Sequence, residues 1–295
     1  MSSALSTQVK ISKAYSPLKI GGSKGDYRQQ VYDMLIAFRV GHQAKSIVEP
    51  FVGGHNMAPV YDRYREHYAD PLSIIPITIS DVNHYIGDIW REIKHNPLTV
   101  AEFYMHQWNL MSMNGKSHFY RLRDAFNEYH HPIALLTLQR WGFGGKMSFD
   151  KHGKYATTVA NSRVGLTPDK LWKSVHQWSD YLKNTSILTA DYAELPHSLF
   201  TDAIVFLDPP YARVWNKTYT GKPFDMAAYY DWVVSLKDSW VISAVPTHDI
   251  TEYGAKAGLE YQIYELTHGK DRMNSGKGGF EKDNVHLFLS GRFTQ

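Results

Sequence analysis

Ala203-Ile204-Val205-Phe206-Leu207-Asp208-Pro209-Pro210-Tyr211 is the stretch that decides the fold of this 295-residue chain. Five consecutive apolar residues predict a strand that is buried on both faces, as in a parallel sheet. Two prolines then end the strand and hold the backbone extended. An acidic and an aromatic side chain are thereby fixed at the carboxyl end of a strand, which is the edge where open α/β sheets bind ligands.

The chemistry of this tetrapeptide suits a flat ring that bears an amino group. The Asp208 carboxylate accepts hydrogen bonds from an amino group, and a backbone carbonyl beside it accepts another. The ring of Tyr211 is placed to stack on a planar partner. Together Asp208, Pro209, Pro210 and Tyr211 predict a site for an amino-substituted nucleobase. The alternative, on these four residues alone, is a strand that ends in an ordinary Pro-Pro turn.

Composition excludes several classes of protein. Hydrophobic residues make up 43% of the chain and charged residues 21%, which predicts a well-formed core rather than disorder. The absence of cysteine excludes disulfides, thiolate metal sites and cysteine nucleophiles. The 15 histidines show no metal-ligand spacing, so we expect no metal. No apolar run is long enough for a membrane span and no leader is visible, so we expect a soluble, cytoplasmic protein.

Short apolar runs alternate with amphipathic segments over most of the chain. The runs that predict strands are Ile47–Phe51, Ile74–Ser80, Ser186–Thr189, Ala203–Leu207, Trp240–Val245, Tyr261–Leu266 and Val285–Leu289. Helical spacing covers Tyr27–Val40 and Met226–Leu236, and Asp225 is the predicted N-cap of the second helix. This alternation predicts an α/β fold built on a mostly parallel sheet.

Strand signals almost vanish between Val82 and Asn184. Helical spacing there covers Ile86–Lys94, Val100–Met113, His118–Glu128 and Pro168–Leu182. We therefore predict a mainly helical domain at 85–184, inserted into an α/β domain made of 1–84 and 185–295. The insert carries 13 Lys or Arg against 8 Asp or Glu. This modest excess suits either a phosphate-facing surface or an ordinary solvated one.

Residues 139–163 concentrate cations, aromatic residues and glycines within the insert. Five Lys or Arg stand against one Asp, with Trp141, Phe143, Phe149 and Tyr155 between them. This mixture predicts a β-hairpin that reaches the phosphates and base edges of a nucleic acid. The alternative is a surface loop whose aromatic rings pack on neighbouring helices.

A glycine turn follows the first strand, in Ile47-Val48-Glu49-Pro50-Phe51-Val52-Gly53-Gly54. Such glycines let backbone approach a ligand closely, although the G-x-G-x-x-G spacing of dinucleotide sites is absent. A second glycine turn, with two lysines, lies upstream at 18–25. Asp81 closes the second strand and Asp191 the next, and such positions hold ribose hydroxyls in nucleotide-binding sheets. Taken singly, these are also ordinary loop glycines and helix-capping aspartates.

In the order of these motifs the chain resembles the AdoMet-dependent DNA adenine-N6 methyltransferases of the Dam type, the D12 or alpha class. That family carries a lysine-containing GG-K turn, an E-P-F-x-G-x-G turn, an aspartate after strand two, a helical target-recognition insert and a late D-P-P-Y. The resemblance spans nearly the whole chain. It implies a Rossmann-like AdoMet-dependent methyltransferase sheet with an inserted, mainly helical target-recognition domain.

The resemblance also implies which residues form the site. Those around S-adenosyl-L-methionine (AdoMet) would be Lys24, Glu49, Pro50, Phe51, Gly53, Asp81, Asp191 and Tyr192. The residues that hold the target adenine would be Asp208, Pro209, Pro210 and Tyr211. Three departures fall in the cofactor turns: Ile20 replaces the usual aromatic residue, Ser23 interrupts the GG-K turn, and the second glycine of G-x-G is displaced, which gives Gly53-Gly54-His55.

The family reads its target sequence with an N-R-x-x-F-N-G-x-x-R-x-N-x-x-G hairpin. Arg140, Phe143, Gly145 and Gly153 fit that frame, but Ser148 stands where the second arginine is expected. The implied DNA contacts are Arg140, Phe143, Lys146, Ser148, Lys151 and Lys154. Because arginine is the commonest reader of guanine, this departure leaves the recognition sequence open.

The implied reaction is methyl transfer from AdoMet to N6 of an adenine that is flipped out of double-stranded DNA. Asp208 and the Pro209 carbonyl would accept the two N6 hydrogens and Tyr211 would stack on the base, with no metal or covalent intermediate. We further expect a monomer or weak dimer in a bacterial or phage-infected cell, associated with the nucleoid, as an orphan or restriction-modification methylase. Two alternatives stay open: methylation of cytosine N4, and a DNA-binding relative that has lost catalysis.

Overall fold

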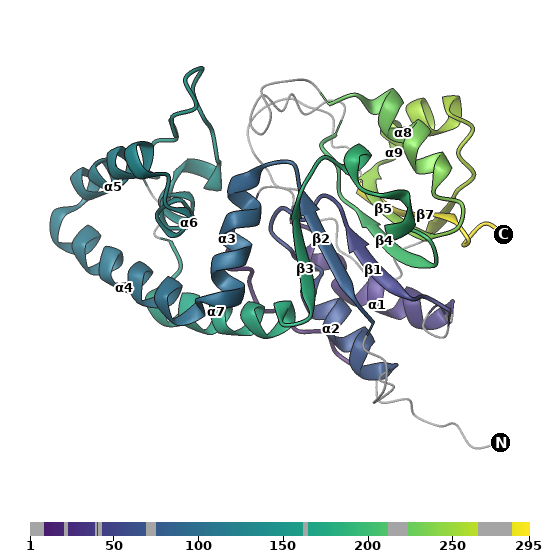
Figure 1. The fold of residues 1–295 in the computed structure, drawn as a ribbon, viewed down its shortest axis with the longest axis horizontal. Helices are drawn as coiled ribbons and strands as arrows, with labels where there is room; N and C mark the ends of the chain where they lie inside the picture. The colour runs from purple at the N-terminus through teal and green to yellow at the C-terminus, as the bar shows by residue number, and fades with distance from the viewer. Residues whose placement is uncertain are drawn as a thin grey trace.

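The computed structural model describes residues 9–20, 23–38, 40, 43–68, 75–161, 165–211, 224–264 and 285–295. The strands in these ranges form one seven-stranded sheet, in the order β3-β2-β1-β4-β5-β7-β6 (Figure 1). Their bounds are β1 Ser46–Glu49, β2 Ile77–Asp81, β3 Thr185–Thr189, β4 Ala203–Leu207, β5 Trp240–Pro246, β6 Gln262–Tyr264 and β7 Val285–Gly291.

Strand direction identifies the type of sheet. Strands β1 to β5 pair in parallel, whereas β7 runs antiparallel to both of its neighbours. All seven predicted strands are present, and their ends differ from the predicted ones by at most two residues where both are described. Residue 74 of the second and residues 265 and 266 of the sixth lie outside the described ranges. The predicted Rossmann-like class, a mostly parallel sheet with covering helices, is confirmed.

Strand β4 is buried along its whole length, as its apolar run predicts. Ile204 and Phe206 belong to the hydrophobic cluster on one face of the sheet, and Val205 and Leu207 to the cluster on the other. Alternation between the two faces is the period of a strand, and apolar residues at every position mean that both faces are covered. The strand that carries the tetrapeptide is therefore at the centre of the core.

Helices cover both faces of the sheet. On one face α8 (Met226–Ser235) begins where predicted, because the Asp225 carboxylate accepts a hydrogen bond from the Ala228 N–H at 3.0 Å. On the other face lie α1 (Arg28–Ala37) and α2 (Ala58–His67). Helix α2 starts at a proline-containing turn directly after the glycine loop, where the sequence left a helix start open without giving its range.

The segment between β2 and β3 is helical, and Figure 1 shows its helices gathered on one side of the sheet. They are α3 His84–His95, α4 Pro97–Asn114, α5 Lys116–Tyr129, α6 Pro132–Trp141 and α7 Pro168–Leu182. Four of the five were predicted within a few residues. The sequence pattern missed α6 because each of the nine residues from 133 to 141 is buried, which removes the amphipathic period.

This helical segment shares one hydrophobic cluster with the sheet. From α3, Trp90 Nε1 donates to the Gly53 carbonyl at 3.0 Å, and Lys94 Nζ donates to the Thr185 carbonyl of β3 at 2.8 Å. We retain 85–184 as the proposed target-recognition insert. Its first helix, α3, also packs on the sheet. The hydrophobic core is therefore continuous across the proposed boundary at residue 85.

In the segment predicted as a β-hairpin, 139–163, the described residues pair in the antiparallel sense but form no regular strands. Residues 139–141 form the end of α6, and residues 143–145 form a short 3-10 turn. Two antiparallel bridges, Gly142 with Val159 and Phe149 with Tyr155, and backbone hydrogen bonds such as Phe143 N–H to the Thr158 carbonyl join the two arms. The chain does reverse at 150–154, where the Asp150 carboxylate accepts hydrogen bonds from the backbone N–H groups of His152 and Lys154. We call residues 142–161 the basic loop.

No helix in the described part of the chain combines the length and the apolar character that a bilayer crossing requires.

Candidate functional site

A cavity of about 980 Å³ lies where β3, β2, β1 and β4 end. Every residue predicted to hold the cofactor or the target base lines it, namely Lys24, Glu49, Pro50, Phe51, Gly53, Asp81, Asp191, Tyr192, Asp208, Pro209, Pro210 and Tyr211. Strands β1 and β4 are neighbours at the point where the strand order reverses, and the carboxyl side of such a point is where open sheets bind ligands. The sequence motifs therefore converge on one place.

Four of the carboxylates that line this cavity lie at or just beyond strand ends, in the order of the strands that carry them. Asp191 follows β3, Asp81 ends β2, Glu49 ends β1 and Asp208 follows β4. Adjacent parallel strands bring residues that are far apart in sequence to the same edge. The cavity is thus rich in hydrogen-bond acceptors along one wall.

Asp81 is held by backbone donors on both oxygens. The Gly53 N–H donates to Oδ2 and the Asn83 N–H donates to Oδ1, each at 3.0 Å. Burial raises the pKa of Asp81 to about 6, and the two backbone hydrogen bonds oppose that rise. Gly53 reaches Asp81 because its φ is +41°, a conformation that favours glycine.

Aromatic rings form another wall of the cavity. The Phe51 ring lies 5.3 Å from that of Tyr192 and 6.0 Å from that of Phe224, measured between centroids. Asp191, beside them, accepts a hydrogen bond from the Ala193 N–H at 3.0 Å and caps the turn that carries Tyr192. This wall offers planar apolar contact next to the carboxylates, the pairing that a nucleoside needs.

Asp208 is paired with Lys24, which we had assigned to the cofactor. Lys24 Nζ lies 2.6 Å from Asp208 Oδ1, and it lies 5.1 Å from the centroid of the Tyr211 ring. The Tyr211 hydroxyl also donates to Oδ1, at 3.3 Å. Burial raises the pKa of Asp208, and the Lys24 ammonium opposes that rise. Lys24 lines the cavity as predicted, and its ammonium group forms an ion pair with Asp208.

The Asp81 environment gives a testable pH dependence. If ionised Asp81 accepts hydroxyls of AdoMet, protonation removes that acceptor. We expect AdoMet to bind about tenfold more weakly at about pH 5 than at about pH 7.5, because a group of pKa about 6 is mostly protonated at the lower pH. Isothermal titration calorimetry measures this ratio. Asp81→Asn should bind weakly at both pH values, and an unchanged pH dependence in this variant would assign the effect to another group.

The residues predicted to contact DNA do not all share one surface. Phe143, Lys146, Lys151 and Lys154 are exposed, and Lys146 also lines the cavity. Ser148 is half-buried. Arg140 is 7% exposed in the last turn of α6. The structure therefore brings four of the six to the surface, and Arg163 of the predicted segment lies outside the described residues.

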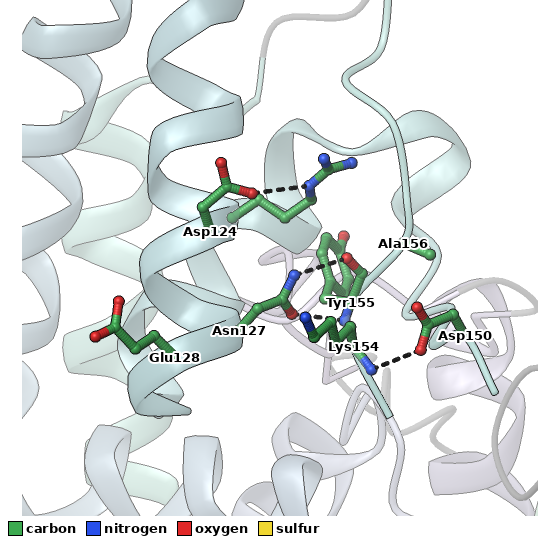
Figure 2. A pocket seen from close by; sticks show the side chains of 8 residues that line it. Asp124, Asn127, Glu128, Asp150, Lys154, Tyr155 and Ala156 are labelled. Carbon is green, nitrogen blue, oxygen red and sulfur yellow. Dashed lines mark hydrogen bonds and ion pairs between the residues drawn. The ribbon is translucent and has the colours of Figure 1, made fainter. Parts of the chain in front are cut away.

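A second cavity, of about 590 Å³, lies between α5 and the basic loop and shares no lining residue with the first (Figure 2). Asn127 of α5 spans it: its Oδ1 accepts from the Tyr155 N–H at 2.7 Å, and its Nδ2 donates to the Tyr155 carbonyl at 3.3 Å. The lining includes three carboxylates, Asp124, Glu128 and Asp150. Asn127 therefore fastens the basic loop to the helical segment, a role that no pattern in the sequence indicated.

Sequence reasoning missed two other residues that shape the first cavity. Arg28, 5% exposed, donates to the backbone carbonyls of Ser12 and Ala14 and to that of Asn56 in the glycine loop. His55, 1% exposed, lies beside Glu49. Neither Arg28 nor His55 belongs to a recognisable motif. The one sequence signal near His55 is the departure from the glycine pattern at 53–55.

Comparison with known proteins gives the family. The model of the D12 class N6 adenine-specific DNA methyltransferases matches residues 22–233. The chain belongs to this family. All the predicted cofactor and target-base residues fall within the matched range.

Several relatives of this methyltransferase are themselves named as DNA methylases or methyltransferases. It is 22% identical to a DNA adenine methylase of Vibrio cholerae, over 71% of this chain and 74% of that protein. It is 23% identical to the type II methyltransferase M.MjaIII of Methanocaldococcus jannaschii, over 92% and 96% of the two chains. A DNA N-6-adenine-methyltransferase of Escherichia phage P1 is 22% identical over 68% of this chain and 26% of that protein.

The family settles the reaction among the alternatives. This methyltransferase acts on adenine N6 in DNA, so neither cytosine N4 nor a purely DNA-binding role is required to explain the site. In the described part of the chain, no three His, Asp or Glu side chains come together as a metal site.

Proposed function

We propose that the methyltransferase binds AdoMet between the glycine loop and the Phe51–Tyr192 wall, and holds a flipped-out adenine at Asp208–Tyr211. The single observation that supports this most strongly is that one cavity is lined by both sets of residues. A target base and a methyl donor that react directly must occupy adjoining parts of one water-excluding space. Proximity is the main catalytic contribution that such a cavity supplies.

The cofactor half of the cavity fits a nucleoside that carries an amino acid. Asp81 and Glu49 supply acceptors for hydroxyl or ammonium groups, and Phe51 with Tyr192 supplies an apolar wall for a base. When bound, AdoMet supplies an electrophilic methyl group. The protein's own contribution is to orient that group and to exclude water.

The target half of the cavity fits an exocyclic amine. The two contacts to the Asp208 carboxylate from Lys24 and Tyr211 both fall on Oδ1, so Oδ2 is the atom that we assign to an N6 hydrogen. The Pro209 carbonyl would accept the other N6 hydrogen, and the Tyr211 ring would stack on the base. Hydrogen bonds from the amine to these two acceptors raise the electron density on N6 and favour its pyramidal form, in which the lone pair is no longer conjugated with the ring and acts as a nucleophile. Lys24 keeps Asp208 ionised for this task.

DNA would approach over the basic loop and the proposed insert at 85–184. Lys146 reaches the cavity itself, and Lys151 and Lys154 are exposed near the reversal of the loop. Phe143 is 61% exposed beside the cavity-lining residues Gly144 and Gly145. We assign phosphate contacts to the lysines and base contacts to the ring; Arg140 is buried in the last turn of α6 and receives no such role.

Removal of the loop cations should weaken DNA binding without harming the cofactor site. For the double variant Lys151→Gln/Lys154→Gln we expect weaker binding to a DNA duplex and a salt dependence whose logarithmic slope is shallower by about one per lysine. Fluorescence anisotropy at several salt concentrations measures the slope. The matched control is Lys45→Gln/Lys237→Gln, two exposed lysines outside the insert, next to the amino ends of β1 and β5. Equal slopes in the two double variants would refute the assignment.

The proposed function is tested by expression in a host that lacks adenine methylation, followed by sequencing of the host DNA with modification-sensitive reads. We expect N6-methyladenine at one short sequence motif. Unmodified DNA, from soluble protein that binds AdoMet in calorimetry, would contradict a role on genomic duplex DNA.

A further inference from the structure

His55 is a buried histidine in a backbone conformation that histidine adopts only at a cost. Its φ is +44°, in the left-handed region that favours glycine, and its side chain is 1% exposed. Gly53, two residues earlier, has a φ of +41°. The turn after β1 thus bends through two left-handed residues, and the chain supplies glycine only at the first. The sequence suggested a displaced second glycine; in the structure His55 itself occupies that left-handed position.

The imidazole of His55 is directed at a carboxylate of the cavity. His55 Nδ1 lies 2.8 Å from Glu49 Oε2, and Glu49 is 3% exposed and lines the cavity. An ionised carboxylate only accepts, so the ring nitrogen is the donor. Burial raises the pKa of Glu49, and the charge and hydrogen bond of His55 oppose that rise. The histidine therefore favours the ionised form of Glu49.

The histidine is fixed by three helices. Its ring lies 5.9 Å from that of Tyr61 on α2 and 5.7 Å from that of Trp90 on α3, between centroids. From α7, Trp178 Nε1 donates to the His55 carbonyl at 3.1 Å. Because the His55 ring is held on several sides, its hydrogen bond restricts the rotation of the Glu49 carboxylate. Strained backbone such as that of His55 is retained where the surrounding structure or the function requires it.

We propose that His55 is a positioning residue for the methyl donor: by bonding Oε2 it fixes the orientation in which the Glu49 carboxylate meets an ammonium or hydroxyl group of AdoMet. Catalysis at Asp208 does not involve His55 directly. The inference rests on the proposed cofactor half of the cavity and adds a residue whose side chain acts through Glu49.

Two variants of His55 distinguish the effect of its N–H donor from the effect of its imidazole ring. His55→Gly suits the left-handed backbone and removes the donor; His55→Asn also tolerates this backbone and places an N–H donor at the same distance from the Cα as Nδ1. Both lose the imidazole ring. We expect His55→Gly to raise the Kd and the KM for AdoMet about tenfold, the loss expected for a hydrogen bond to a buried charge, and His55→Asn to restore most of that loss. The kcat at saturating AdoMet and the KM for DNA should stay near wild type in both.

A double-mutant cycle tests whether the effect passes through Glu49. In a Glu49→Ala background, His55→Gly should cause no further loss of AdoMet affinity, because the group that it positions is gone. If Glu49→Ala binds AdoMet as the wild type does, the proposed cofactor site itself fails. If Glu49→Ala weakens binding but His55→Gly does not, or if the two losses are independent, only the His55 inference is overturned.

A measurement on the unmodified protein covers the case in which a glycine at 55 prevents folding. Nitrogen-15 NMR of histidine-labelled protein reports which ring nitrogen carries a proton, and the His55→Asn variant assigns the signal among the 15 histidines. We expect a proton on Nδ1 of His55 with and without AdoMet. A bare Nδ1 would make Glu49 the donor and would overturn the proposal.

Discussion

Asp208→Asn is expected to lower kcat about 10³-fold or more, because it removes an acceptor that acts on the amine as the methyl group is transferred. The amide that replaces the carboxylate is neutral and presents N–H donors to the N6 hydrogens. Lys24, 2.6 Å away, would then lose the negative charge of Asp208. Single-turnover methylation of a DNA duplex measures the chemical step separately from DNA binding and release.

The control for this variant is Asp225→Asn. Asp225 lines the same cavity, but its carboxylate caps α8 by accepting the Ala228 N–H at 3.0 Å, and asparagine caps helices equally well. We expect its kcat to match the wild type. For Asp208→Asn we expect unchanged affinities for AdoMet and for DNA, so the loss should fall on kcat alone. A kcat within tenfold of the wild type would show that Asp208 does not act on the amine.

Lys24→Met is expected to lower kcat at neutral pH about 10²-fold, because the ammonium that keeps Asp208 ionised is lost. Burial raises the pKa of Asp208, and removal of Lys24 lets it rise further. A protonated Asp208 is a poorer acceptor for the N6 hydrogen that we assign to it. Activity should therefore recover as the pH is raised, and the acidic limb of the kcat profile should move to higher pH in the variant.

Lys45→Met provides a matched ion pair elsewhere. Lys45 Nζ lies 2.6 Å from Asp202 Oδ2, the same separation as in the Lys24 pair, but its side chain is 77% exposed. Exposed pairs contribute little, so the control should leave the profile unchanged. An unshifted acidic limb in Lys24→Met would mean that this lysine does not tune Asp208.

The central sheet and most of the site were predictable because they depend on local patterns. The fully apolar β4 and the Pro-Pro stop after it place Asp208 at a strand end without any knowledge of tertiary contacts. Asp81, likewise, follows an apolar run. The shared edge of a parallel sheet then brings these carboxylates together.

The remaining features depend on contacts that no local pattern encodes. Lys24 meets Asp208 across 184 residues of chain, a pairing that the sequence pattern did not indicate. α6 is buried on every side and therefore lacks the period that marks a surface helix. The basic loop forms only an irregular antiparallel pairing, and the side chains of Asn127 and Asp150 bond part of its backbone. His55 replaces an expected glycine, and its role depends on the neighbouring Glu49.

The central claim is that the tetrapeptide end of this cavity transfers the methyl group of AdoMet to adenine N6. The most direct test incubates purified protein and duplex DNA with AdoMet that carries a deuterated methyl group, then measures nucleosides by mass spectrometry. We expect deuterium-labelled N6-methyladenine from the wild type and from Asp225→Asn, and none above background from Asp208→Asn. Labelled N4-methylcytosine, or equal labelling by Asp208→Asn, would contradict the claim.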